Sequence, residues 1–207
     1  MRIVKKKFLY IISPNKIQKN FYKDLVNIFK LKTTSVFQLR LKKYNYRKKI
    51  YIAKKIKQIC RIYKVKFVIN DDVLLASKLC ADGCHLGQSD MKPNKARKIL
   101  GNKIIGVTCH NSIKLVREAL NLKVDYIAIG SFFNSSTKKT KFRTDLKFLR
   151  MVRKISNVPI VAIGGINEKN FKKLLLHKAD FLAISGYIWR NKKLSPVKAV
   201  ENIRVQK

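Results

Sequence analysis

The chain has 207 residues, 46% of them hydrophobic, and 48 Lys and Arg against 11 Asp and Glu give it a formal net charge of +37. A chain of this length and apolar content fits one domain with a sizeable core, so we expect a single domain over residues 1–207. No apolar run reaches the ~18 residues that a membrane-spanning helix needs, which argues against a membrane protein.

The positive charge is spread over nearly every segment instead of forming a long basic tail. A polyanion partner and a general excess of lysine on solvated faces both explain such a charge. No basic run is interleaved with aromatic residues, as it would be in a protein that stacks nucleic-acid bases. The scatter favours the solvated-surface interpretation, so we expect no specific nucleic-acid partner and no membrane partner.

The first residues and the cysteines indicate the cellular compartment of the protein. The start MRIVKKKFLYIIS is basic and then apolar, but its apolar part is short and no small-residue cleavage site follows, so it predicts a first strand and a cytoplasmic protein. The four cysteines form no C-x-x-C pair, and Cys84 and Cys109 lie in apolar runs typical of buried thiols. A zinc site at Cys80, Cys84 and His85 lacks a second ligand pair.

Eight short apolar runs follow one another along the chain and predict strands. Most are rich in Val, Ile and aromatic residues with little polar alternation, as in strands that are covered on both faces. Their ranges are 8–13, 35–40, 66–70, 82–86, 103–108, 125–130, 159–164 and 180–185.

Segments with helical spacing lie between most of these runs. The clearest are 16–30, 112–122, 145–155, 167–177 and 195–203, and Asn167 is the expected N-cap of the fourth. Strand and helix alternating eight times predict a parallel sheet, and about 200 residues suffice for a closed (β/α)8 TIM barrel. A doubly wound open sheet is the alternative, and the absence of G-x-G-x-x-G after the first run disfavours it.

Polar residues follow the predicted strands, at the end where barrels carry their catalytic groups. Asp71 and Asp90 come from neighbouring strands and would suit Mg²⁺, which prefers carboxylates together with phosphate oxygens. Arg40, Lys42 and Lys138 would neutralise a diphosphate bound to that metal. Asp71 read alone is also a candidate helix N-cap.

A second anion site is predicted near the last two strands. The Gly164–Gly165 turn and the end of the eighth run would expose backbone N–H groups to a phosphate. Ser135 and Thr137 supply hydroxyl donors in a loop rich in Ser, Thr and Lys. His85 lies in the middle of a run, which favours a structural or pocket-lining role over that of a general base.

Seven motifs in order give the chain a resemblance to the thiamine phosphate synthase family over nearly its full length. They are QLR with Lys42, IND at 69–71, ADGCHLGQSDM at 81–91, IIGVTCHN at 104–111, DYIAIGSFFNSSTKKT at 125–140, VAIGGINEKN at 161–170 and AIS at 183–185. The resemblance implies a (β/α)8 barrel that joins hydroxymethylpyrimidine diphosphate to hydroxyethylthiazole phosphate. In that family the diphosphate leaves first, and the thiazole nitrogen attacks the resulting cation.

The resemblance also implies a role for each matching residue. By motif, Asp71 and Asp90 resemble the Mg²⁺ ligands, and Arg40 and Lys138 the catalytic cations. The implied substrate contacts are Gln38 for the pyrimidine, Arg40, Lys42, Asn70 and Lys138 for the diphosphate, Thr108 in a place that usually holds Ser, Ser135 and Thr137 in the phosphate loop, and Gly165, Ile184 and Ser185 for the thiazole phosphate.

Four departures from the family pattern stand beside these matches. The usual Glu after Arg40 is Leu41, the usual acid after the first strand is replaced by Ser13-Pro14, and the usual Pro before the Ser/Thr loop is Asn134. A glycine common after that loop is missing at 142–145. They bear on catalytic efficiency and loop shape, and none removes an expected ligand.

Two other functions remain alternatives. A thiazole tautomerase shares the barrel and the phosphate cradle, but an isomerase has no need of Arg40, Asp71, Asp90 and Lys138 together. A degenerate barrel that binds polyanions would have lost its strand-end polar groups. The sequence therefore favours a Mg²⁺-dependent transferase with small phosphorylated substrates, and it leaves open whether the chain forms a homo-oligomer.

Overall fold

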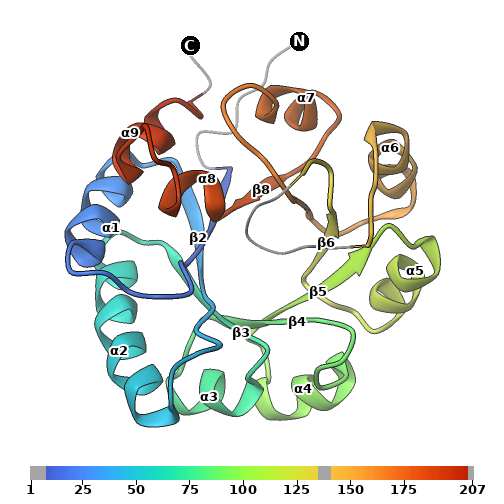
Figure 1. The fold of residues 1–207 in the computed structure, drawn as a ribbon. Helices are drawn as coiled ribbons and strands as arrows, with labels where there is room; N and C mark the ends of the chain where they lie inside the picture. The colour runs from blue at the N-terminus through green and yellow to red at the C-terminus, as the bar shows by residue number, and fades with distance from the viewer. Residues whose placement is uncertain (1–7, 135–140, 205–207) are drawn as a thin grey trace.

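The computed structural model describes residues 8–134 and 141–204, and these form a barrel of eight parallel strands that closes with β1 beside β8 (Figure 1). The strands are β1 (Leu9–Ile12), β2 (Thr34–Leu39), β3 (Lys66–Asn70), β4 (Gly83–Leu86), β5 (Ile104–His110), β6 (Tyr126–Gly130), β7 (Ile160–Ile163) and β8 (Phe181–Ile184). All eight overlap the predicted runs. The predicted (β/α)8 barrel is confirmed, and the open-sheet alternative is wrong.

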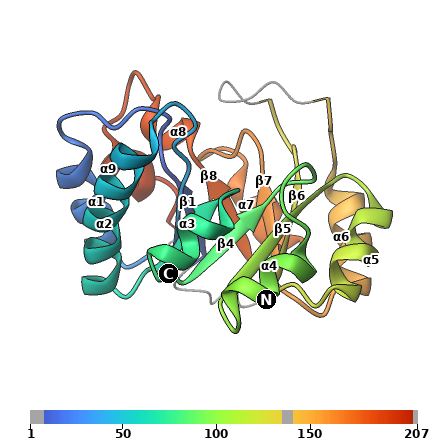
Figure 2. The same ribbon diagram turned by 90° about the horizontal axis from the view of Figure 1, so that it is seen from below.

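Helices surround the strands and follow them around the barrel (Figures 1 and 2). They are α1 (Phe21–Lys30), α2 (Tyr46–Ile62), α3 (Val73–Lys78), α4 (Pro93–Leu100), α5 (Ile113–Asn121), α6 (Leu146–Ile155), α7 (Phe171–Leu176), α8 (Gly186–Trp189) and α9 (Pro196–Glu201). Within the described ranges, no helix combines the length and apolar character needed to cross a bilayer.

Two predicted helix starts are wrong. The first helix begins at Phe21, and the residues before it lie in a loop in which the backbone N–H of Ile17 donates to the hydroxyl of Tyr44 at 2.9 Å. Asn167 is not an N-cap: its N–H donates to Oδ1 of Asn170 at 2.9 Å, so residues 167–170 form a turn before α7. The short helix α8, directly after β8, was not predicted.

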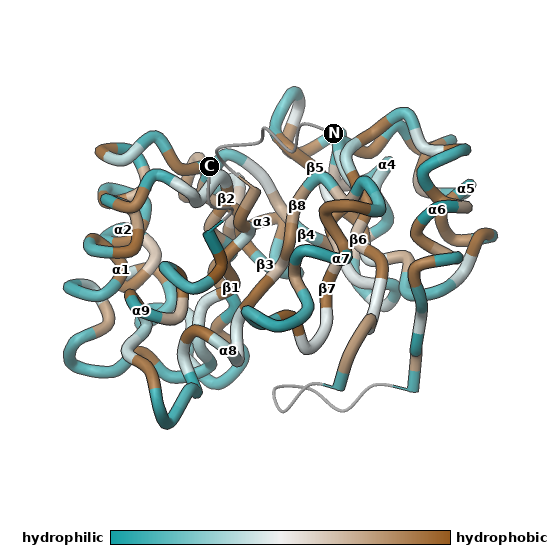
Figure 3. Tube along the Cα trace, turned by 90° about the horizontal axis from the view of Figure 1, so that it is seen from above, coloured by the Kyte–Doolittle hydropathy of each residue, from teal (hydrophilic) through white to brown (hydrophobic). Residues whose placement is uncertain are grey.

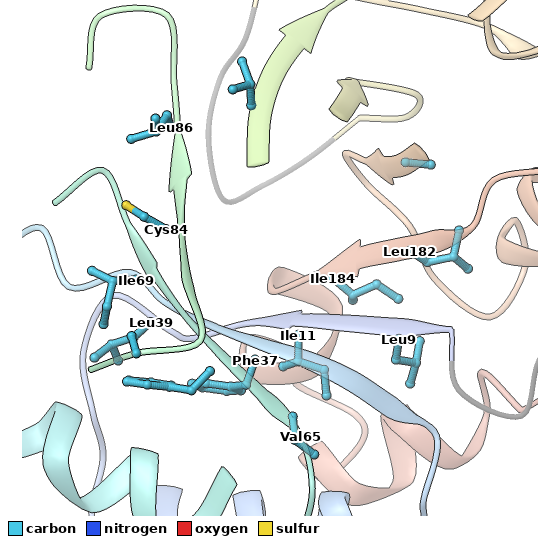
Figure 4. Close-up of a cluster of buried hydrophobic side chains, with 14 of the residues drawn as sticks. Leu9, Ile11, Phe37, Leu39, Val65, Ile69, Cys84, Leu86, Leu182 and Ile184 are labelled. Carbon is cyan, nitrogen blue, oxygen red and sulfur yellow. The ribbon is translucent and has the colours of Figure 1, made fainter. Parts of the chain in front are cut away.

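Strand side chains alternate between two apolar layers. Outward residues pack against the helices, and Figure 4 shows Ile11 of β1, Phe37 of β2 and Ile184 of β8 in this outer layer. A smaller inner cluster includes Tyr10 and Tyr126 inside the barrel. In Figure 3 the strands are mostly hydrophobic and the hydrophilic stretches lie mainly along the outer helices and loops, which agrees with lysines spread over solvated faces.

Gly106 makes room for an aromatic ring inside the barrel. A Cβ atom at this position of β5 would overlap the ring of Tyr126 on the neighbouring strand β6. The hydroxyl of Tyr126 can therefore reach the centre of the barrel, where Tyr10 of β1 lies at a ring-centroid distance of 5.8 Å. This pairing places polar groups in a layer that barrels usually fill with branched aliphatic residues.

Three aspartates, which we call the strand-capping aspartates, hold the amino-terminal ends of the strands. Asp82 before β4 accepts from the N–H of Phe67 in β3 at 2.8 Å. Asp125 before β6 repeats the contact with Ile105 of β5 at 2.7 Å, and Asp180 before β8 repeats it with Ile160 of β7 at 2.9 Å. Each carboxylate satisfies a backbone donor at the barrel rim and fixes one strand against the next.

Each strand-capping aspartate also pairs with a cation. The partners are Lys66 at 3.3 Å, Arg97 at 2.6 Å and Arg153 at 2.7 Å. The Arg153–Asp180 pair is the least exposed of the three, with side-chain exposures of 25% and 18%, so it is screened least by solvent.

We predict that Asp180→Ala lowers the free energy of unfolding by about 2 kcal/mol, because it removes charge-assisted hydrogen bonds to the Ile160 N–H and the Arg153 guanidinium. Asp24→Ala is the matched control, because burial raises the pKa of Asp24 and folding therefore does not favour its charge. The control should change stability by less than about 0.5 kcal/mol. Urea denaturation of both variants measures the difference. An equal decrease in the free energy of unfolding in the two variants would contradict the capping role.

Candidate active site

Arg40 is held at the carboxyl end of β2 by residues that follow β1. Its backbone N–H donates to the Ser13 hydroxyl at 2.9 Å, and its Nη1 donates to Oδ1 of Asn15 at 3.1 Å. The Ser185 hydroxyl donates to the Ser13 carbonyl at 3.3 Å. Ser13 thus joins the ends of β1, β2 and β8 and fixes the Arg40 backbone, while Asn15 holds the guanidinium.

Asp71 and Asp72 follow β3 and have different tasks. Asp72 is the N-cap of α3, where its Oδ1 accepts from the N–H of Leu75 at 2.9 Å. Asp71 has a φ of 67°, a left-handed conformation, and its N–H donates to the His85 carbonyl at 2.8 Å. Because Asp72 serves as the cap, the Asp71 carboxylate is left for the site, and the interpretation of Asp71 as an N-cap is wrong.

The carboxyl groups of Asp71 and Asp90 lie within hydrogen-bonding reach of each other. Oδ2 of Asp90 accepts from the Gly87 N–H at 2.7 Å, and Lys42 Nζ lies 3.3 Å from Oδ2 of Asp71. Burial and the neighbouring Asp71 carboxyl raise the pKa of Asp90, against the Gly87 N–H and Lys42, which lower it. Two acids this close repel each other when both are ionised, and a cation between them removes that repulsion.

A pocket of about 400 Å³ opens beside this acidic pair. Lys42, Asn70 and Asp71 line it together with Leu41 and Met91. The pocket thus brings two predicted diphosphate contacts, Lys42 and Asn70, to the same opening as the predicted metal ligand Asp71.

A chain of hydrogen bonds crosses the inside of the barrel below these residues. Gln38 Nε2 donates to the Tyr10 hydroxyl at 3.0 Å, and the hydroxyls of Tyr10 and Tyr126 are 2.7 Å apart. His85 links the chain onward, with Nδ1 2.8 Å from the Tyr126 hydroxyl and Nε2 2.8 Å from Thr108 Oγ1. We call these five residues the interior relay.

His85 is buried, and burial lowers its pKa to about 4, so the imidazole is neutral at neutral pH. Its neutral ring lies between two hydroxyl groups of the relay, which agrees with a structural role, one of the two expected from its place in the strand.

A turn of two glycines follows β7. Gly164 and Gly165 have φ values of 107° and 64°, and a Cβ on Gly165 would overlap the Asn134 carbonyl. Asn170 Nδ2 donates to the Gly165 carbonyl at 3.0 Å and fixes the turn from the other side. The close packing on the loop after β6 explains why these positions carry no side chain.

The end of β8 contributes backbone more than side chains. Ile184 packs its side chain into the outer apolar layer, so only its backbone can face a ligand, and the Ser185 hydroxyl is bound to Ser13. The predicted cradle of Gly165, Ile184 and Ser185 therefore depends on main-chain N–H groups, which suit a phosphate.

Known proteins with a similar sequence point to one family. Residues 9–188 match the family described as thiamine monophosphate synthase. The thiamine-phosphate synthase of Pelagibacter ubique (strain HTCC1062) is 59% identical over 202 residues, which cover 97% of this chain and 98% of that relative.

The chain belongs to the thiamine monophosphate synthase family. The resemblance inferred from the seven motifs is thereby confirmed. A second relative, the thiamine-phosphate synthase of Erythrobacter litoralis (strain HTCC2594), is 38% identical over 92% of this chain and 92% of its own length. The solved thiamine phosphate pyrophosphorylase of Pyrococcus furiosus superposes with a TM-score of 0.85 at 29% identity, covering 96% of this chain and 94% of that one.

Most residues expected from the thiamine monophosphate synthase motifs lie at one end of the barrel or just inside it. These are Gln38, Arg40, Lys42, Asn70, Asp71, Asp90, Thr108, Gly165 and Ser185, which lie in the last three residues of their strands or follow them. Ser135, Thr137 and Lys138 lie outside the described residues. The described chain beyond them is anchored at Phe142, whose ring stacks on His110 at 4.0 Å and whose carbonyl accepts from the Ser131 N–H at 3.2 Å.

Four residues of the site were missed by sequence reasoning. Tyr10 and Tyr126 belong to runs in which every residue is buried, so no polar alternation marked their inward face. Ser13 stands out in the sequence only as a departure from the family pattern, and nothing marks Asn15. Both nevertheless hold Arg40. Gly106 opposite an aromatic residue was the one available signal for the interior relay.

Among the described residues, no group of three or more His, Cys, Asp or Glu side chains is arranged to hold a metal ion. A divalent cation at Asp71 and Asp90 would thus have two carboxylate ligands. Two carboxylates with substrate phosphates are the usual donor set of Mg²⁺, so the acidic pair fits that ion. The cysteines do not suggest zinc, because Cys84 is buried and Cys80 exposed.

Proposed function

We propose that this chain is a Mg²⁺-dependent thiamine-phosphate synthase that joins hydroxymethylpyrimidine diphosphate to hydroxyethylthiazole phosphate. The observation that carries the proposal is the acidic pair Asp71–Asp90 with Lys42 beside it, at the same barrel end as Arg40. Membership of the thiamine monophosphate synthase family supports this reaction over other barrel chemistry.

The reaction exchanges one bond for another. The C–O bond between the pyrimidine methylene and the diphosphate breaks, and pyrophosphate leaves with the electron pair. The thiazole nitrogen then donates its lone pair to the methylene carbon, which forms the C–N bond and leaves a positive charge on that nitrogen. The step needs stabilisation of developing negative charge on the leaving group more than it needs an acid or a base.

The cationic side chains are positioned for that stabilisation. Arg40 would contact the diphosphate through the guanidinium nitrogens that Asn15 leaves available, and Lys42 would move from Asp71 toward the phosphate oxygens. Asn70 would add an amide donor from the end of β3, and Lys138 a further charge. A metal ion held by Asp71 and Asp90 supplies additional neutralisation of the diphosphate when bound.

The two organic parts of the substrates would occupy different places. Gln38 and Thr108, at the two ends of the interior relay, would contact the pyrimidine ring. The backbone of Gly165, Ile184 and Ser185 would bind the thiazole phosphate, with Ser135 and Thr137 contributing hydroxyl groups. Separate anion sites keep the thiazole phosphate from competing with the diphosphate.

The direct test mixes the purified protein with both substrates and Mg²⁺. We predict stoichiometric formation of thiamine phosphate and pyrophosphate, with no product when EDTA removes the metal. Isomerisation of a thiazole phosphate without condensation would support the tautomerase alternative instead. Polyanion binding in the absence of either reaction would support the degenerate-barrel alternative.

The remaining expectations belong to the same proposal. Small phosphorylated molecules are the expected partners, without a specific nucleic acid or a membrane, and the expected location is the cytoplasm. Whether a second copy of the chain is needed can be measured by comparing specific activity across protein concentrations.

A further inference from the structure

The interior relay is shielded from solvent over most of its length. Gln38 and Tyr10 are each 2% exposed, Tyr126 is 6% exposed and His85 9% exposed. Buried polar atoms must find their hydrogen-bond partners within the protein. Each hydrogen of the relay therefore needs an acceptor among its neighbours, and this requirement fixes the direction of the whole chain.

The amide of Gln38 sets that direction. Its Nε2 atom has hydrogens but no acceptor capacity, so the Tyr10 hydroxyl accepts there. The Tyr10 hydrogen then points to the Tyr126 oxygen, 2.7 Å away, and the Tyr126 hydrogen to Nδ1 of His85. The opposite direction would require the Gln38 amide to be turned so that Oε1, instead of Nε2, faces the Tyr10 hydroxyl.

The imidazole of His85 determines which way the last hydrogen bond of the relay, to Thr108, points. A neutral imidazole has one N–H group, and because Nδ1 accepts from Tyr126, the hydrogen is on Nε2. Nε2–H donates to Thr108 Oγ1 at 2.8 Å. The Thr108 hydroxyl hydrogen is then the last in the chain, and within the described residues it has no recorded acceptor.

We propose that Tyr10, Tyr126 and His85 are positioning residues that make the Thr108 hydroxyl a fixed hydrogen-bond donor to a ring nitrogen of the pyrimidine substrate. The inference rests on the proposed function for the identity of that ring. Thr108 is half-buried at the carboxyl end of β5, where an incoming ring can reach it. An uncharged aromatic nitrogen accepts this hydrogen, whereas a ring N–H at the same place would oppose it.

The tautomer of His85 tests the direction without any substrate. The chain has three histidines, so His110→Gln with His177→Gln leaves His85 as the only source of imidazole signals. In ¹⁵N NMR spectra of this double variant at neutral pH, we expect a protonated Nε2 and an unprotonated Nδ1. A protonated Nδ1 would overturn the proposal.

Tyr126→Phe tests the positioning role. It removes the donor to His85 Nδ1, so the imidazole is free to populate both tautomers and the NMR signals should change accordingly. We expect the KM for the pyrimidine diphosphate to rise about fivefold, the effect of one net hydrogen bond, while the KM for the thiazole phosphate stays within about twofold.

Tyr63→Phe is the matched control, because Tyr63 lies at the C-cap of α2 and packs against Phe29 outside the barrel interior. It should leave both KM values and the His85 signals unchanged. An equal rise of both KM values in Tyr126→Phe, or no rise, would overturn the positioning role. If the wild-type protein formed no thiamine phosphate, the proposed function would fail, yet the NMR result would still decide the direction of the relay.

Discussion

Asp90→Asn should lower kcat by about 10²- to 10³-fold, the effect of losing one preorganised electrostatic group, and at the same time make the folded protein more resistant to heat. The activity falls because one of two carboxylates is lost from the proposed metal site. The fold should persist. In the wild-type protein the Gly87 N–H donates to the Asp90 carboxylate, and the side-chain oxygen of an asparagine can accept the same hydrogen bond.

The gain in thermal stability follows from the pKa of Asp90. Folding raises this pKa, so the carboxyl group stabilises the folded state at low pH and this contribution disappears as the pH rises through the folded-state pKa. At neutral pH the ionised group therefore opposes folding, and asparagine removes that opposition. Melting temperatures of both proteins at pH 4 and pH 7, without metal, should differ more at pH 7.

Saturating Mg²⁺ provides the control for this variant. The metal should raise the melting temperature of the wild-type protein, because it binds the folded state, and raise that of Asp90→Asn much less. A variant with wild-type kcat at limiting Mg²⁺ would show that Asp90 is not a metal ligand in this reaction.

Arg40→Ala should lower kcat by about 10²-fold or more, as expected for a charge that stabilises the leaving group. The guanidinium is fixed by Asn15, and the backbone by Ser13, so its position costs little reorganisation during the reaction. A charge acts on the diphosphate only at short range, because the Debye length is ~8 Å at physiological salt.

Arg47→Ala is the control for bulk charge. Arg47 is exposed in the first turn of α2, so its removal changes the net charge by the same amount. We expect its kcat at matched ionic strength to stay within about twofold of the wild type, as for a typical surface substitution. Equal losses in the two variants would mean that the overall positive field, and not local placement, drives the reaction.

The barrel was predictable because each strand is short, apolar and separated from the next by a helical segment. The strand-end residues were predictable for the same reason, since parallel strands bring their carboxyl ends together. The split between Asp71 and Asp72 was not, because adjacent acids look alike in a sequence. The left-handed conformation of Asp71 and the hydrogen bond from Leu75 to Asp72 appear only in three dimensions.

The interior relay was hidden for a different physical reason. Strand β1 has the sequence LYII and is buried on both faces, so alternation does not reveal that Tyr10 points inward. The partner hydroxyl on Tyr126 is 116 positions away in sequence, and only barrel closure brings it within 2.7 Å. Likewise, Ser13 gains its role only because β1 lies beside both β2 and β8.

The strand-capping aspartates limit how many acidic residues this chain can lose by mutation. Its basic side chains are spread over solvated faces, where one cation substitutes for another and selection has little to act on. Its acids have no such freedom: seven of the eleven either cap a strand or a helix or form the acidic pair. Loss of any of these seven would therefore cost stability or activity, so they set a lower bound on the acidic content that this chain can tolerate.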